Sequence, residues 1–160
     1  MKRLLCVLKN DLALQVIFMT LMMKKTHQIS DCSRKTRRYL NLAREVAKKS
    51  TYGKLRHGAL LVKGGSVIST AYNKSNFNSF GNRFREHDRG PATHHAELGC
   101  ILGVDKSKTD GATLYVTRVN TRGEYMLSRP CKMCHDILKH CGVKRVIYTI
   151  NSSTIESYKL

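Results

Sequence analysis

Residues 111–150 read "GATLYVTRVNTRGEYMLSRPCKMCHDILKHCGVKRVIYTI", and this stretch carries the strongest information on the fold. Its apolar runs at 111–120 and 143–150 predict two strands, and residues 131–142 between them predict a helix. Two strands joined by a crossing helix run parallel in the same sheet. The stretch therefore predicts a layered α/β domain.

The upstream segments extend this arrangement. Residues 33–50 carry apolar side chains at helical spacing and basic side chains on the other face, which predicts an amphipathic helix with Ser33 as its cap. Residues 55–73 hold two apolar runs around "KGG", a pattern typical of a β-hairpin. Residues 91–103 predict a short helix that starts near its proline, whereas residues 74–91 lack any period and predict a long loop.

The end of the chain constrains the last strand. Only ten residues follow Ile150, and a crossover to another parallel strand needs at least about a dozen. A strand at 154–160 must therefore return by a tight turn and pair antiparallel with its predecessor. Together the segments predict a mixed sheet of about five strands.

The first residues are expected to form an extension, residues 1–30, that is poorly ordered and lies outside a folded domain at residues 31–160. Residues 12–23 are apolar but too few to span a bilayer, and no small-residue cleavage site follows them. We therefore expect neither a signal peptide nor a membrane anchor. We interpret about the first 22 residues as an upstream reading extension that packs poorly.

The chain carries 29 basic and 11 acidic residues, a net charge of +18. Such a charge is typical of proteins that bind nucleic acid, phosphorylated metabolites or an anionic membrane surface, although it also serves solubility. The six cysteines lack the spacing of a secreted disulfide framework. We therefore expect a reducing compartment, the cytoplasm with the nucleus as an alternative, and thiols that are free to bind a metal.

The sequence "RPCKMCHDILKHC" at 129–141 concentrates cysteine and histidine. Taken alone, its "CKMC" is compatible with a redox pair or a zinc knuckle, but residues 140–141 lie two turns down the same helix, too far to complete a tetrahedron. A better third ligand is His95, in the sequence "HAE". Together, His95, Cys131 and Cys134 leave a fourth position open for water, as in catalytic zinc sites.

Glu97 lies two positions after His95 and points away from it, so its carboxylate need not bind the metal. It is placed to accept a proton from the water and to hand it on. The pattern H-x-E followed by P-C-x-x-C is the signature of zinc deaminases, and the chain carries it complete, with Pro130 before the cysteines. With these motifs the chain resembles the cytidine deaminase superfamily, in particular its CMP/dCMP-type deaminase domains, over residues 35–150.

Beyond the metal motifs, the resemblance rests on "HGALLV" at 57–62, "AYN" at 71–73 and "GATLYVT" at 111–117. It implies a three-layer α/β/α fold with a central mixed sheet and an antiparallel last strand. It also implies that the His and two Cys bind Zn²⁺, that Glu97 is the proton shuttle and that Asn73 contacts the sugar or base. The longer, basic segment 118–129 departs from the short connection of many relatives, so the substrate stays open.

Further candidate substrate contacts lie near these motifs: Ala96, Arg85, Arg129 and Tyr148. In deaminases, arginines around the zinc mouth hold phosphates and aromatic side chains stack on bases. A solvated loop is the alternative for Arg85, and core packing is the alternative for Tyr148. His94 is interpreted as a surface or capping group, and His57 as a residue at a strand edge.

The predicted function is hydrolytic deamination of cytosine to uracil in a (deoxy)cytidine nucleotide or nucleoside. The positive charge keeps single-stranded DNA or RNA as an alternative substrate. A catalytically inactive module that binds nucleic acid is the non-enzymatic alternative, and the presence of Glu97 argues against it. No membrane partner is expected, and a homo-oligomer is suggested by the resemblance alone.

Overall fold

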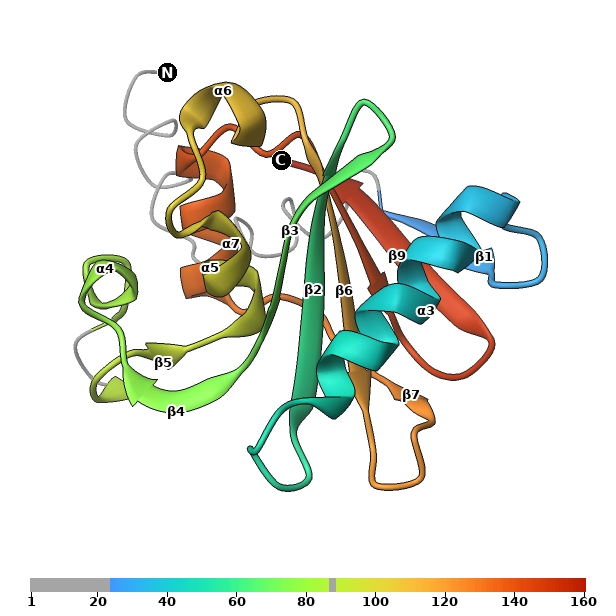
Figure 1. The fold of residues 1–160 in the computed structure, drawn as a ribbon, viewed down its shortest axis with the longest axis horizontal. Helices are drawn as coiled ribbons and strands as arrows, with labels where there is room; N and C mark the ends of the chain where they lie inside the picture. The colour runs from blue at the N-terminus through green and yellow to red at the C-terminus, as the bar shows by residue number, and fades with distance from the viewer. Residues whose placement is uncertain (1–23, 87–88) are drawn as a thin grey trace, which may run out of the picture.

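The computed structural model describes residues 24–86 and 89–160, and most of its strands form one sheet (Figure 1). The strands of this sheet are β1 (Lys25–Gln28), β2 (Arg56–Lys63), β3 (Ser66–Tyr72), β6 (Thr113–Val119), β7 (Tyr125–Met126), β8 (Arg145–Thr149) and β9 (Thr154–Lys159). The helices are α3 (Arg34–Lys48), α4 (Ser79–Asn82), α5 (Ala96–Ile101), α6 (Lys106–Thr109) and α7 (Lys132–His140). A small second sheet pairs β4 (Lys74–Phe77) with β5 (Thr93–His94).

The main sheet has the order β1-β9-β8-β6-β2-β3, with β7 paired to β6. Strands β6 and β8 are parallel and are joined through α7, as the sequence predicts. The other pairs are antiparallel, including β8 with β9, so the mixed sheet and its antiparallel last strand are confirmed. The two short strands β1 and β7 extend the five that were expected.

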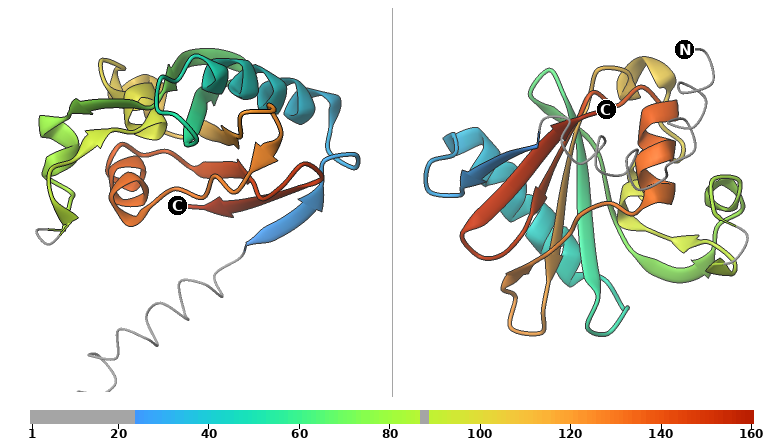
Figure 2. Two further views of the ribbon diagram at one scale, coloured as in Figure 1. Left: turned by 90° about the horizontal axis from the view of Figure 1, so that it is seen from below. Right: turned by 180° about the vertical axis from the view of Figure 1, so that it is seen from behind.

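Helices cover both faces of this sheet (Figures 1 and 2). Helix α3 packs Leu40 and Ala43 against Leu60 and Tyr115 on one face. Helices α5 and α7 lie on the other face, where Ala96 and other side chains from both helices meet the second apolar core. The three-layer α/β/α architecture is therefore confirmed, and the beginnings of α5 and α7 come together on the face away from α3.

Local sequence signals explain two of these elements. The hydroxyl of Ser33 accepts a hydrogen bond from the amide of Thr36 at 3.1 Å and so caps α3 as expected. The β2–β3 turn places Gly64 and Gly65 at φ values of +57° and +84°. Two consecutive residues with positive φ are what a tight hairpin turn between twisted strands requires.

The expected loop at residues 74–91 is wrong, because it contains β4 and α4. The side chain of Asn78 accepts a hydrogen bond from the amide of Gly81 and caps the short helix. Helix α5 also begins at Ala96 rather than near Pro91, since the chain first pairs β5 with β4. Four-residue elements show no periodicity, and only their tertiary partners stabilise them.

Residues 25–28, which the sequence analysis placed in the extension, form β1 at the edge of the sheet. They pair with residues 154–157 of β9. The remainder of the expected extension, residues 1–23, lies outside the described residues, so the boundary of the domain stays a prediction.

Among residues 24–86 and 89–160, none of the helices has the length and apolarity that a membrane crossing would need.

Gly58 of β2 lies directly beneath α3 and supplies the first prediction. A Cβ atom at this position would lie 2.3 Å from the carbonyl oxygen of Ala43 and 2.5 Å from the amide nitrogen of Ala47. Both atoms belong to the helix backbone, so the helix would have to move. We expect Gly58→Ala to lower the free energy of unfolding by roughly 1–3 kcal/mol in chemical denaturation. Ser66→Ala, on an exposed position of the adjoining strand, is the control, and equal stability of the two variants would contradict this account.

Candidate active site

Two helix starts bring the metal motifs together. His95 is the N-cap residue of α5, and Cys131 is the N-cap residue of α7, with Cys134 in the first turn of α7. The Nδ1 atom of His95 lies 3.6 Å from the Sγ atom of Cys131 and 3.4 Å from that of Cys134. All three ligand atoms lie within 4.8 Å of one another. Residues 36 positions apart in the chain thus form one compact group.

The group fits zinc. Tetrahedral Zn²⁺ with Zn–S bonds of about 2.3 Å and Zn–N bonds of about 2.0–2.1 Å requires nitrogen-to-sulfur separations of about 3.5 Å. The two separations from His95, 3.6 and 3.4 Å, match this requirement. One imidazole and two thiolates are also a ligand set that zinc prefers. Three protein ligands leave a fourth position, as catalytic zinc sites do.

The two thiols differ in their protonation. The pKa of Cys131 is lowered to about 4, chiefly because its sulfur accepts a hydrogen bond from Cys134. The pKa of Cys134 is raised, first by donating this hydrogen bond and second by burial. The contact with Cys131 also raises the pKa of His95. Without metal, Cys131 is therefore the thiolate of the pair, and binding zinc requires Cys134 to release its proton.

Glu97 occupies the first turn of α5 and is only 5% exposed. Burial raises the pKa of its carboxyl, and the neighbouring His95 partly offsets this effect. The nearby Glu97 carboxylate in turn contributes to the raised pKa of Cys134. A buried carboxylate therefore lies beside the metal ligands without belonging to the three-residue group.

The other candidate ligands point elsewhere. The Nδ1 atom of His94 lies 3.3 Å from the side-chain nitrogen Nδ2 of Asn78, and the His94 ring packs against Gly99. His140 lies against the ring of Phe84, with 5.5 Å between the ring centroids. Within the described parts of the chain, the only group of metal-binding side chains found is His95, Cys131 and Cys134.

Asn73, which follows β3, and Ala96, the first residue of α5, are both buried. The side-chain oxygen of Asn73 accepts a hydrogen bond from the amide of His57 at 2.8 Å, and its amide group donates to the carbonyl of Leu55 at 2.7 Å. These bonds tie the end of β3 to the start of β2. Ala96 follows His95 directly and is completely buried. Their proposed substrate contacts stay predictions.

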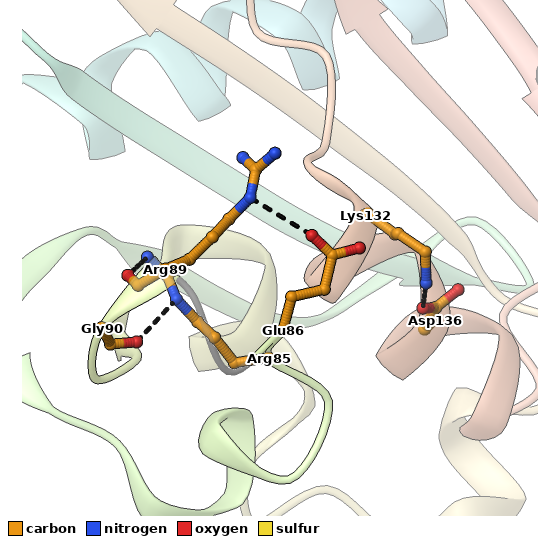
Figure 3. A network of polar contacts seen from close by, with 6 residues as sticks. All are labelled: Arg85, Glu86, Arg89, Gly90, Lys132 and Asp136. Carbon is orange, nitrogen blue, oxygen red and sulfur yellow. Dashed lines mark hydrogen bonds and ion pairs between the residues drawn. The ribbon is translucent and has the colours of Figure 1, made fainter.

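Arg85 is held by its own loop (Figure 3). Its Nε atom donates to the carbonyl of Gly90 at 3.1 Å, and a terminal nitrogen donates to that of Arg89 at 2.9 Å. The same loop brings Glu86, paired with Arg89, toward Lys132 at the start of α7. Arg85 therefore shapes the loop beside the cluster, and a role in substrate binding remains a prediction.

Tyr158, which no motif of the sequence indicates, lies on the same face of the sheet as the cluster. Its ring stacks on His135 of α7 with 5.7 Å between centroids and meets the edge of Tyr148 at 6.0 Å. Burial, and next the Glu97 carboxylate, raise the pKa of Tyr158. Tyr148 is fully buried and donates a hydrogen bond to Glu156. The alternation of side chains in the last strand could have revealed Tyr158, given the register of β9 against β8.

Arg129 is exposed on the segment that leads to the cysteine pair. Its charge acts on Tyr148 and Tyr158, in both cases lowering a pKa that burial raises. Arg129 thus lies near Tyr148 and Tyr158, and the proposed contacts of Arg129 and of the buried Tyr148 with substrate stay predictions.

His57 is not a simple strand-edge residue. It lies in β2, between β3 and β6, and burial lowers its pKa to about 4. His95 and Cys131 also act on this pKa, so the His57 ring lies close to the metal ligands. Its Nδ1 atom contacts the carbonyl of Leu55 at 3.3 Å, which leaves the other ring nitrogen available to the site.

Sequence comparisons relate this chain to known proteins. The family model described as the cytidine and deoxycytidylate deaminase zinc-binding region matches residues 33–150. The deoxycytidylate deaminase of Mycobacterium phage D29 is 28% identical over 125 residues, which cover 69% of this chain and 90% of that protein.

Two solved structures are similar to this chain. Apo dCMP deaminase from the cyanophage S-TIM5 is 21% identical and superposes with a TM-score of 0.50 over 74% of this chain and 86% of that one. Acinetobacter baumannii RibD, form 2, is 19% identical with a TM-score of 0.49 over 73% of this chain, which spans only 28% of RibD. Because the family model spans most of the 160 residues and includes both metal motifs, the chain belongs to the cytidine and deoxycytidylate deaminase family, whose defining region binds zinc.

Proposed function

We propose that the protein is a zinc-dependent hydrolytic deaminase that converts cytosine to uracil in a (deoxy)cytidine nucleotide. The observation that carries this proposal is the buried Glu97 carboxylate beside a group of three metal-binding side chains. Three ligands leave one coordination position of a tetrahedral zinc ion for water. A purely structural zinc site normally has four protein ligands and no need of a buried carboxylate. The inactive-module alternative therefore leaves Glu97 unexplained.

His95, Cys131 and Cys134 would hold the zinc ion. When bound, zinc lowers the pKa of a coordinated water toward neutrality and so supplies a nucleophile. The backbone amides at the start of α7 favour the thiolate forms of the two cysteines. The surroundings lower the pKa of Cys131 but raise that of Cys134, which would release its proton when zinc binds.

Glu97 would move the protons. Water adds to carbon 4 of cytosine, and Glu97 accepts a proton from that water and delivers it to the adjacent ring nitrogen. Glu97 then takes the remaining proton of the added hydroxyl and delivers it to the amino group; the bond from carbon 4 to this nitrogen breaks, ammonia leaves, and the carbonyl of uracil remains. Burial keeps the carboxylate away from bulk water.

The basic side chains of α3 do not support a polynucleotide substrate. Helix α3 carries six basic residues and one acidic residue, but α3 covers the sheet face opposite α5 and α7 (Figure 2). A polynucleotide substrate requires a basic track that leads to the reacting base. The relative from phage D29 is named a deoxycytidylate deaminase, which also supports a nucleotide substrate.

The decisive experiment is product analysis with the zinc-loaded protein. We expect ammonia and the matching uracil product from dCMP or CMP, and at most slow reaction of a single-stranded oligonucleotide. Faster reaction of the oligonucleotide would favour the polynucleotide alternative. No uracil product from any of these substrates or from the free nucleosides would refute the proposal.

Removal of zinc supplies a further prediction. Treatment with a chelator is expected to abolish deamination and to lower the melting temperature by roughly 5–10 °C, because a ligand bound to the folded state stabilises it. Added Zn²⁺ should restore both properties, whereas Mg²⁺ should not, since thiolate ligands disfavour it. Full activity in protein shown by elemental analysis to be metal-free would contradict the zinc dependence.

A further inference from the structure

Arg118 lies on the sheet face that carries the metal cluster. Side chains alternate along β6, and Leu114 and Val116 belong to the core beneath α5 and α7. Arg118 follows Val116 by two positions and so faces the same side. Arg118 belongs to neither metal motif. It is the first residue of the segment 118–129, which is longer than the corresponding connection in many relatives.

The register of the sheet places Arg118 beside the site. Arg118 pairs with His57 of β2 on one side and with Met126 of β7 on the other. His57 and Ala59 lie two positions apart on β2 and face the same side, and Ala59 packs in one core with Ala96, the residue that follows His95. Arg118 and His57 therefore lie side by side on neighbouring strands, on the sheet face where α5 begins.

The Nε atom of Arg118 stands out among the buried polar atoms of the described residues. Its Nε atom is buried and has no hydrogen-bond acceptor among the described residues. The salt bridges found within residues 24–86 and 89–160 join Lys48 with Glu45, Arg89 with Glu86 and Lys132 with Asp136. Leaving a charged donor buried without an acceptor is unfavourable. An anion at this position would satisfy it.

We propose that Arg118 binds the 5′-phosphate of a mononucleotide substrate and thereby selects nucleotides over nucleosides. The inference rests on the proposed function and specifies its substrate class. A planar guanidinium matches the oxygens of a phosphate with two parallel hydrogen bonds. The nucleotide would then extend from the metal cluster, past His57, to Arg118, with its base at the cluster and its phosphate one strand away.

Binding measurements test Arg118 without requiring turnover. In titration calorimetry, zinc-loaded wild type is expected to bind dUMP more tightly than deoxyuridine. Arg118→Met should weaken dUMP binding by roughly 10- to 100-fold, because it removes hydrogen bonds to a charged group, and should leave deoxyuridine binding unchanged. Arg118→Lys, which keeps the charge but loses the paired geometry, should fall between the two.

Arg122→Met is the matched control. Arg122 lies in the same segment and is exposed, so its replacement should leave both affinities unchanged. If Arg118→Met does not fold, as judged by melting temperature and zinc content, the comparison rests on Arg118→Lys. Unchanged dUMP affinity in a folded Arg118 variant would overturn the inference, as would an equal loss for dUMP and deoxyuridine.

Other outcomes separate this inference from the proposed function. A wild type that binds dUMP through Arg118 but deaminates no cytosine substrate supports the inference and refutes the proposed function. A wild type that deaminates nucleosides and dCMP equally well supports the reaction and overturns the inference. Loss of oligonucleotide binding in Arg118→Met, with dUMP affinity unchanged, would assign Arg118 to a backbone phosphate and likewise overturn it.

Discussion

Glu97→Gln is expected to lower the rate of deamination by about 10²–10⁴-fold, the usual contribution of a positioned proton-transfer group. The amide keeps the size of the side chain and much of its hydrogen bonding, but it cannot accept a proton from water. Because Glu97 is not one of the three clustered ligands, zinc content should stay at that of the wild type. Initial rates with dCMP, together with elemental analysis, measure both effects.

Glu45→Gln is the matched control for this variant. Glu45 is exposed on α3 and pairs with Lys48 at 2.7 Å, on the sheet face away from the cluster. The same change of charge at this position should leave the rate unaltered. Wild-type activity in a zinc-loaded Glu97→Gln protein would remove Glu97 from the reaction and would leave the inactive-module alternative standing.

Cys134→Ser is expected to abolish zinc binding and, with it, activity. Cys134 is completely buried beside Leu98 and Ile137, so solvent cannot replace its sulfur easily. Loss of a residue that merely supports a ligand costs about 10- to 100-fold in metal affinity, and loss of the ligand itself should cost more. Elemental analysis after dialysis should therefore find little zinc in the variant.

Cys141→Ser provides the control, because Cys141 follows the last residue of α7 and lies outside the three-ligand group. It should keep its zinc and its activity. If Cys141→Ser lost zinc while Cys134→Ser retained it, the cluster assignment would fail and a local site along α7 would replace it. The two variants thus test the prediction that residues 140–141 lie too far along α7 from Cys131 and Cys134 to bind the same metal ion.

Much of the fold could be predicted because its signals are local. The strand, helix and strand of residues 111–150 show their periodicity directly, and the last strand pairs antiparallel with its predecessor, as expected. Helix α3 carries its own cap and an apolar stripe. Elements of four residues or fewer, such as β4 and α4, have no such pattern, so they were mistaken for a loop.

The candidate site also contains residues that the sequence predicts and one that only the structure identifies. The two metal motifs are so specific in spacing that His95, Cys131, Cys134 and Glu97 could be named together from the chain alone. Tyr158 could not, because its place beside the cluster follows from the pairing of β9 with β8.

Features that depend on residues close together in the chain could therefore be predicted from the sequence. These are the types and spacing of the metal ligands, the helix caps and the alternation that defines strands. The partners of Arg118, His57 and Tyr158 depend on register between strands distant in the chain, where a shift of one residue would turn every side chain to the opposite face. Packing against α3 on one face and α5 with α7 on the other selects that register, since only one choice buries both apolar faces. That global balance, rather than any local motif, places Arg118, whose Nε atom has no acceptor among the described residues, opposite His57 on the sheet face that carries the metal cluster.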